Sequence, residues 1–287
     1  MYTVTKGTLG AYECYTLADT DAGTTAVIVP EKGGMAVSLT KGGEEFCWLR
    51  HPNFEQPERP RCGVPICFPV CGPTPDEGNE FLGARYPMTV HGLLHSVPWH
   101  YDGEDTHDGA SLTVAVHDDA ETRKSYPFAF RVRVTYTLRG AKLCVAQTYE
   151  NTGSEAMPFS FGFHPYFSIT HVDNLVWDLR AENVRDAATG ALTPFAGVDF
   201  PYDADQTTRH YAGVQSPMSF WDKGNGHRVT VAFDRHFTNA VLWQQGAERF
   251  VCMEPWNGYP GSLRGAHETL PAGESLHAEF TIEWDKA

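Results

Sequence analysis

Apolar and polar residues alternate with a period of two in several short segments of this chain. Near the C-terminus, five apolar residues are each separated from the next by one polar residue: Leu276, Ala278, Phe280, Ile282 and Trp284. The same alternation runs over residues 131–138, and after a turn at Arg139-Gly140 a second strand is expected over about 142–150. A period of two is typical of a strand with one buried and one exposed face. The two adjacent segments therefore predict a β-hairpin.

Further short strands are predicted where glycine pairs interrupt apolar stretches. They cover residues 26–29, 35–39 and 46–49, with Gly33-Gly34 and Gly42-Gly43 between them, and also 112–116 and 229–233. No helical periodicity of useful length, internal repeat or linker-like break is visible, and the pattern assigns no element to residues 197–213. Many short antiparallel strands predict an all-β fold, a large antiparallel β-sandwich with few or no long helices. We expect a single domain over residues 1–287, with two stacked β domains as the alternative.

The charge balance narrows the choice of partner. The chain has 287 residues, of which 41% are hydrophobic and 20% charged, and its 22 basic and 36 acidic residues give a net charge of −14. A nucleic acid or an anionic membrane surface usually requires a basic footprint, so neither is expected as a partner. The N-terminal residues lack the pattern of a secretory signal, and no apolar run approaches membrane-spanning length. A cytoplasmic location is the expectation.

The cysteine pattern points to reduced thiols. Seven cysteines are scattered along the chain, at Cys14, Cys47, Cys62, Cys67, Cys71, Cys144 and Cys252. An odd number without regular spacing is not a disulfide framework and suits a reducing compartment. The clustered trio at 62, 67 and 71 reads C-x4-C-x3-C, which misses a ferredoxin-like spacing by one residue.

Histidine spacing gives no metal site either. His91 and His95 are four residues apart, as zinc ligands on a helix are, but Pro87, Gly92 and Pro98 make a helix there unfavourable. We therefore expect no metal and no cofactor. Most of the 13 histidines, His210 among them, stand in polar surroundings and are predicted to be surface or hydrogen-bonded residues.

Three residues stand out by their surroundings. His91 opens the segment VHGLLHSVPWH, His164 lies in FSFGFHPYFSI, and Glu254 lies in FVCMEPWNGYPG. A glutamate in an apolar and aromatic stretch is unusual, because Glu is rarely buried unless it is paired. His164 and Glu254 each precede a proline, which favours extended backbone and marks a place where a strand ends or bulges. In a β protein such places present reactive side chains held by the sheet, with aromatic neighbours suited to a sugar ring.

Four motifs in this order resemble the aldose 1-epimerase (galactose mutarotase) family, nearest its shorter bacterial, LacX-like branch. They are RCGVPICFPVCGP, VHGLLHSVPW, FGFHPYFS and MEPWNG, and the resemblance covers about residues 20–285. It implies a galactose mutarotase-like β-sandwich that binds a small sugar and interconverts its α and β anomers without a cofactor.

The resemblance also assigns roles to individual residues. Glu254 matches the general base and His164 the general acid, while His91 matches a second histidine that contacts the sugar near the ring oxygen. Arg61 matches a sugar-binding arginine. An aspartate that binds sugar hydroxyls falls in FPYDAD, where Asp203 and Asp205 both remain possible.

The reaction itself accounts for these residue types. Mutarotation removes the proton of the anomeric hydroxyl and delivers one to the ring oxygen, so that the C1–O5 bond breaks. The open aldehyde then rotates about C1–C2, and the ring closes on the other face. One carboxylate and one imidazole suffice, and each such proton transfer contributes roughly 10²–10⁴-fold in rate.

Two other functions compete with this one. A hexose-6-phosphate 1-epimerase is the first, but relatives of that type often read HGFAR where this chain reads HGLLH, with His95 in place of the arginine. The second is a non-catalytic carbohydrate-binding β-sandwich. Such a protein needs no paired acid and base, so the presence of both His164 and Glu254 counts against it. The sequence leaves open which aldose is the physiological substrate and what the oligomeric state is.

Overall fold

The secondary structure is almost entirely β. The computed structural model describes residues 1–49, 61–264 and 267–286. Within those residues the only helices are three 3₁₀ turns of three residues each: η1 (Thr122–Lys124), η2 (Val172–Asn174) and η3 (Ser262–Arg264). No described helix is long and apolar enough to cross a membrane. The all-β antiparallel sandwich expected from the alternating pattern is confirmed.

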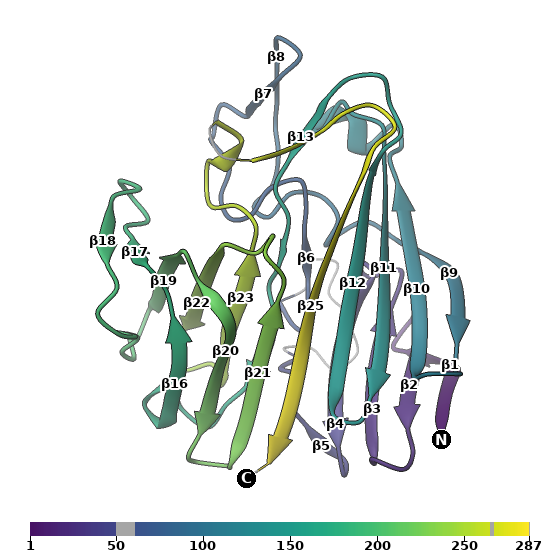
Figure 1. The fold of residues 1–287 in the computed structure, drawn as a ribbon, viewed down its shortest axis with the longest axis vertical. Coiled ribbons are helices and arrows are strands. Elements are labelled where there is room, and N and C mark those ends of the chain that lie inside the picture. The colour runs from purple at the N-terminus through teal and green to yellow at the C-terminus, as the bar shows by residue number, and fades with distance from the viewer. Residues whose placement is uncertain (50–60, 265–266, 287) are drawn as a thin grey trace.

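Sheet I is the largest layer and contains the predicted hairpin. It extends from β16 at the left of Figure 1 across β25 to β9 at the right. In the hairpin Arg139 pairs with Lys142, and Gly140 takes a φ of 59° in the two-residue turn, which is a conformation that glycine adopts without strain. The strands in order are β16 (Leu175–Arg180), β20 (Gln215–Asp222), β21 (His227–Phe233), β25 (Ser275–Lys286), β12 (Lys142–Asn151), β11 (Phe130–Arg139), β10 (Ala110–His117) and β9 (His100–Asp105).

Two further sheets pack against one face of sheet I. Sheet II contains, in order, β18 (Leu192–Pro194), β17 (Asn183–Arg185), β19 (Gln206–Ala212), β22 (Asn239–Gln245), β23 (Phe250–Trp256), β14 (Gly162–Phe163) and β6 (Ile66–Cys67), and β15 (Tyr166–Ser168) also pairs with β23. Sheet III consists of β1 (Tyr2–Leu9), β2 (Tyr12–Asp19), β3 (Thr24–Val29), β4 (Met35–Lys41) and β5 (Glu44–Glu45). Two small two-stranded sheets lie outside these layers: the hairpin of β7 (Asn79–Phe81) with β8 (Ala84–Tyr86), and the long-range pair of β13 (Met157–Phe159) with β24 (Glu268–Leu270).

The prediction of a strand over residues 46–49 is wrong. Sheet III ends at β5, and the next residues make only single bridges, from Cys47 to Phe167 and from Leu49 to Cys62. The segment is apolar because it crosses from sheet III to sheet II with Phe46 and Cys47 buried, so its hydrophobicity reflects burial and not a ladder of strand pairs.

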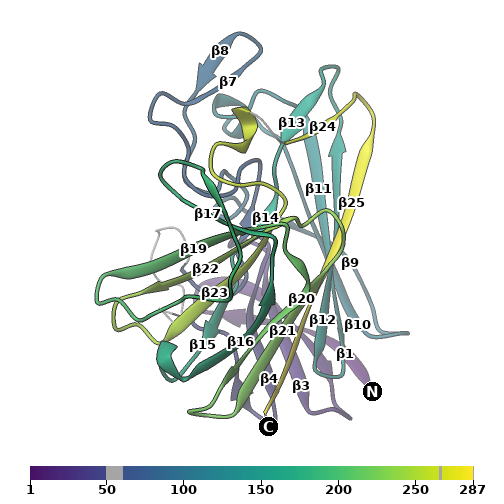
Figure 2. The ribbon, with the colours of Figure 1, turned by 60° about the vertical axis from the view of Figure 1, so that its left-hand side comes forward.

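The core lies between sheet I and the other two sheets. Alternate residues of β11, such as Val132 and Val134, are fully buried there, and so are Val251 and Met253 of β23. Figure 2 shows β19, β22 and β23 at the left and β11, β12 and β25 at the right. Successive side chains of a strand point to opposite faces. Cys252 and Glu254 alternate with Val251 and Met253 along β23, so they face away from sheet I. We call this the outer face of sheet II.

Candidate functional site

A buried carboxylate lies at the middle of the outer face of sheet II. Glu254 of β23 is only 1% exposed although it points away from the main core. It pairs with Val241 of β22, and its neighbours along the same face of β23 are Cys252 and Trp256. These side chains belong to small apolar clusters that cover the outer face, which explains how a residue on an outer face is buried.

His164 meets this carboxylate. Its Nε2 atom is 3.4 Å from Oε1 of Glu254, and both side chains are buried. His164 lies in the break between β14 and β15, where its backbone N–H donates to the carbonyl of Pro65 at 2.9 Å. The pre-proline position of His164 thus coincides with an interrupted strand, as its sequence context predicts. The strand end or bulge expected at Glu254 is wrong, because β23 continues through Pro255 to Trp256 in unbroken register with β22.

A glycine allows β14 to lie so close to β23. Gly162 pairs with Trp256 on one side and with Cys67 on the other. A Cβ atom at this position would come within 2.7 Å of Cδ1 of Trp256 and within 2.9 Å of the Pro255 carbonyl oxygen. The small residue therefore brings His164, two residues later, within reach of Glu254.

Aromatic rings hold the imidazole of His164 in place. The ring of Tyr166 stacks on it with centroids 4.8 Å apart, and the ring of Trp243 meets it edge-on at 5.6 Å. Such packing fixes the orientation of the imidazole ring.

His91 is the third member of the cluster. Its ring lies 4.8 Å from the His164 ring and 5.6 Å from that of Trp256. The residue has a φ of 65°, and its segment is fixed by its backbone N–H, which donates to the Gly72 carbonyl at 2.9 Å. In return the Gly72 N–H donates to Nδ1 of His91 at 3.0 Å. Because Nδ1 accepts a hydrogen bond, the ring proton belongs on Nε2, so His91 offers a donor there.

Arg61 lies at the edge of the same group. Its Nη1 donates to Oε1 of Gln245 at 2.7 Å, and its guanidinium carbon is 5.8 Å from the ring centre of Trp243. Since Trp243 also contacts His164, this arginine is connected to the acid–base pair through one shared aromatic side chain.

The two candidate aspartates have a different environment. Asp203 and Asp205 are both exposed in the segment before β19. The carboxylate of Asp203 accepts the backbone N–H of Asp205 at 2.8 Å, so it stabilises its own turn. The structure thus brings together His91, His164 and Glu254, with Arg61 beside them, but it does not join either aspartate to that group.

His210 corrects a sequence prediction. It was expected to be a surface or hydrogen-bonded residue in polar surroundings, yet it is buried in β19. Successive strand pairs of sheet II connect it to Glu254 in the order Arg185, His210, Val241 and Glu254. Burial, and secondarily the positive charge of Arg185, lowers the pKa of His210 to about 4 from an ordinary 6.5. His210 is therefore neutral at pH 7. The sequence of β19 has no period-two pattern that would have predicted this burial, because polar residues occur on both faces of the strand: Gln206 and Thr208 on one, Arg209 on the other.

Cys252 was also missed as a potential functional residue. One ligand atom each from Cys252, His164 and Glu254 lie within 4.8 Å of one another, and all three residues are buried. The alternation of β23, which places residues 252 and 254 on one face, is the signal that could have found it.

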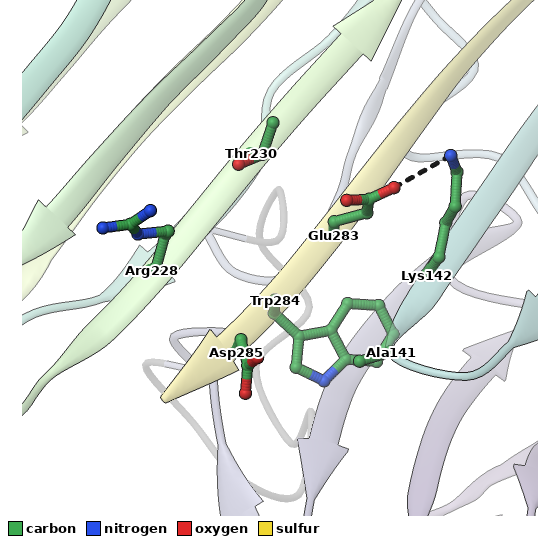
Figure 3. Close-up of a pocket in the computed structure, with 7 residues that line it drawn as sticks. All are labelled: Ala141, Lys142, Arg228, Thr230, Glu283, Trp284 and Asp285. Carbon is green, nitrogen blue, oxygen red and sulfur yellow. Dashed lines mark ion pairs between the residues drawn. The ribbon is translucent and has the colours of Figure 1, made fainter. Parts of the chain in front are cut away.

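A hollow on the outer face of sheet I has a different chemistry. It encloses about 340 Å³ and is lined by Ala141, Lys142, Arg228, Thr230, Glu283, Trp284 and Asp285. Figure 3 shows the Lys142 and Glu283 side chains pointing toward each other across β12 and β25, where they form an ion pair of 2.9 Å. Both are about half exposed. Such exposed pairs are common on protein surfaces, so the His164–Glu254 cluster is the stronger candidate site.

Comparison with known proteins identifies relatives that match most of this chain. Protein LacX (the plasmid form) of Lactococcus lactis is 25% identical over 260 residues, covering 80% of this chain and 84% of that protein. A Salmonella typhimurium protein provisionally named glucose-6-phosphate 1-epimerase is 28% identical over 227 residues, covering 76% of this chain and 70% of that protein.

Solved structures share the fold along the whole chain. The Slr1438 protein of Synechocystis sp. PCC 6803 superposes with a TM-score of 0.90 at 26% identity, covering 100% of both chains. A galactose 1-epimerase of Lactobacillus acidophilus has a TM-score of 0.80 at 16% identity, covering 100% of this chain and 99% of that one, which shows the fold alone. The model of the aldose 1-epimerase family matches residues 13–283, and this chain therefore belongs to the aldose 1-epimerase family.

Proposed function

We propose that this protein is a cofactor-independent aldose 1-epimerase that interconverts the anomers of a free aldose, with Glu254 as general base and His164 as general acid. The observation that carries the proposal is the buried 3.4 Å contact between the two groups. A binding protein needs hydrogen-bonding groups but no buried acid and base, and burying such a pair costs the desolvation of both groups.

The 3.4 Å separation suits the two proton transfers of the reaction. The anomeric oxygen and the ring oxygen of an aldose are both bonded to C1, so they can contact two groups that are one hydrogen-bond length apart. The Glu254 carboxylate takes the proton from the anomeric hydroxyl, while the His164 imidazolium gives its proton to the ring oxygen as the C1–O5 bond breaks. After rotation about C1–C2, neutral His164 takes the hydroxyl proton back, and Glu254 returns its proton to the carbonyl oxygen.

His91 supports this reaction as a neutral donor. Its Nδ1 is engaged by the Gly72 N–H, so its Nε2–H is directed by the backbone and does not have to be ordered when the sugar arrives. We assign it a hydrogen bond to the sugar near the ring oxygen. Arg61, joined to Gln245 and Trp243, is assigned to sugar hydroxyls at the edge of the site.

The substrate is expected to be uncharged. The net charge of −14 disfavours an anionic ligand, and His95 stands where relatives that act on hexose 6-phosphates often carry an arginine. A polarimetric assay should show accelerated mutarotation of α-D-glucose or α-D-galactose, with higher kcat/KM for the neutral sugar than for its 6-phosphate. A tenfold or greater preference for the 6-phosphate would make the protein a hexose-6-phosphate 1-epimerase. Binding without turnover would make it a carbohydrate-binding protein.

A further inference from the structure

Cys252 adds a soft ligand to the acid–base pair. It precedes Glu254 by two residues on the same face of β23, where it pairs with Tyr166 on one side and with Trp243 on the other. Its thiol, the His164 imidazole and the Glu254 carboxylate all lie within 4.8 Å of one another. Among the described residues this is the one such group of histidine, cysteine and acidic side chains.

The separation of the two catalytic atoms matches the ligand spacing of a tetrahedral metal ion. Nitrogen and oxygen ligands that lie about 2.1 Å from zinc at a tetrahedral angle are roughly 3.4 Å apart. Nε2 of His164 and Oε1 of Glu254 are 3.4 Å apart, which is the same spacing. A thiolate bound at about 2.3 Å would lie only slightly farther from each of them, so a small rotation of the Cys252 side chain would complete the set.

The charges also balance. A thiolate and a carboxylate together neutralise a divalent cation, while the imidazole binds in its neutral form. Thiolate and imidazole ligands favour zinc over magnesium or calcium, which prefer oxygen. Binding would release the thiol proton and any proton on His164, so the affinity should rise with pH.

We propose that Cys252, His164 and Glu254 form a binding site for a thiophilic divalent cation of the zinc type, and that occupation of this site inhibits the enzyme. The binding site stands independently of the proposed function, whereas the inhibition rests on it. A bound cation engages the lone pairs that Glu254 and His164 need for proton transfer, so cation and aldose compete for the same two groups. The metal is thus an inhibitor and not a cofactor.

Cobalt(II) tests the site without any activity measurement. Added to the thiol-reduced, metal-free protein, one equivalent of cobalt should produce the near-ultraviolet absorption of a thiolate–cobalt bond. Cys252→Ser, which keeps the volume but removes the soft ligand, should abolish that band, and Cys252→Ala serves as the second variant if the serine protein does not fold. Cys144→Ser is the matched control, because Cys144 is a partly exposed free thiol on β12 of sheet I. A band that is absent from the wild type, or lost in Cys144→Ser and kept in Cys252→Ser, would overturn the site.

Zinc inhibition tests the consequence. The rate of each protein with zinc is compared with its own metal-free rate. The zinc concentration for half-inhibition should rise at least about tenfold in Cys252→Ser, because even the loss of a residue that only supports a metal ligand costs 10–100-fold in metal affinity. Magnesium should not inhibit, excess chelator should restore the wild-type rate, and saturating aldose should weaken the inhibition. Equal zinc sensitivity of wild type and Cys252→Ser would refute the inhibition. A wild type without epimerase activity would refute the proposed function instead, and the cobalt band would still report on the site.

Discussion

The outer faces of sheets I and II carry the same kind of charge pair in opposite settings. On sheet I, Lys142 and Glu283 are 2.9 Å apart and each is about half exposed. On sheet II, His164 and Glu254 are 3.4 Å apart and almost inaccessible to solvent. An exposed pair exchanges water for a partner at little net gain, whereas a buried pair must offset the desolvation of both groups. Burial and not proximity therefore distinguishes the candidate active site from an ordinary surface contact.

The sharpest test of this comparison replaces one carboxylate on each face. Glu254→Gln keeps the shape and removes the base, so kcat should fall by roughly 10²-fold or more while the sugar still binds. Glu283→Gln is the matched control and should leave kcat and KM unchanged. Polarimetric kinetics on both variants, with folding checked by circular dichroism, provide the measurement. Near-normal turnover by folded Glu254→Gln would exclude Glu254 as the base.

A second test examines whether the buried pair acts as a unit. His164→Asn should lower kcat by a factor similar to that of Glu254→Gln, because each variant blocks the same concerted transfer. The double variant should then lose far less than the product of the two single losses. Fully multiplicative losses would mean that the two groups act in separate steps.

The buried His210 of sheet II predicts a pH effect on stability. The pKa of His210 is about 4 in the folded protein, below the ordinary 6.5, so the folded state favours the neutral ring. Above pH 6.5 the ring is neutral in both states; as the pH falls from 6.5 to 4, the unfolded chain takes up a proton that the folded protein does not. The free energy of unfolding should therefore decrease over this range, by up to about 3 kcal/mol from this group.

Urea unfolding at several pH values measures this effect. The difference between wild type and His210→Gln isolates it, because other groups titrate in both proteins. If the two proteins respond equally between pH 6.5 and 4, His210 is not buried in its neutral form.

A smaller effect is expected at His91. Asparagine tolerates the positive φ of this position better than most residues and retains an acceptor for the Gly72 N–H. His91→Asn should thus keep the local backbone but lose the donor to the sugar, with a fall in kcat/KM of roughly tenfold, about the value of one hydrogen bond. Steady-state kinetics should show both a higher KM and a lower kcat. A change in kcat alone would make His91 a proton-transfer residue and not a binding residue.

The smallest effect is predicted for the ion pair of Figure 3. Lys142→Met removes one member of an exposed pair, and the free energy of unfolding should change by less than about 1 kcal/mol. The loss should shrink further when salt is added, because exposed charges are screened. Chemical denaturation at low and high ionic strength gives both values, and a larger, salt-independent loss would show that the pair is structurally important.

The alternation of apolar and polar residues predicted those strands in which one face is buried and the other is exposed to solvent. Strand β11 and the C-terminal strand β25 are such cases, because polar residues mark the outer face at every second position. In β23 all seven residues are buried, so alternation gives no sign of which side faces the core. In β19 polar residues occur on both faces, which concealed His210.

The pairing of distant segments could not be predicted from local pattern. His164 and Glu254 were identified by their pre-proline positions and their aromatic neighbours, and the resemblance to a family assigned their roles. Their 3.4 Å contact depends on Gly162 lying between Trp256 and Cys67, which no local pattern reveals. The environment of Asp205 likewise depends on a distant segment, because its carbonyl accepts the backbone N–H of Gly246 at 2.7 Å.

The alternation of β23 also has a practical meaning for anyone who wishes to alter this protein. Val251 and Met253 face the main core, while Cys252 and Glu254 face the site. A mutant library that varies the first two positions would sample thermal tolerance, and one that varies position 252 would sample selectivity for inhibitors. The two properties are interleaved along a single strand yet separable residue by residue, so each can be tuned by screening while the proton-transfer pair is left untouched.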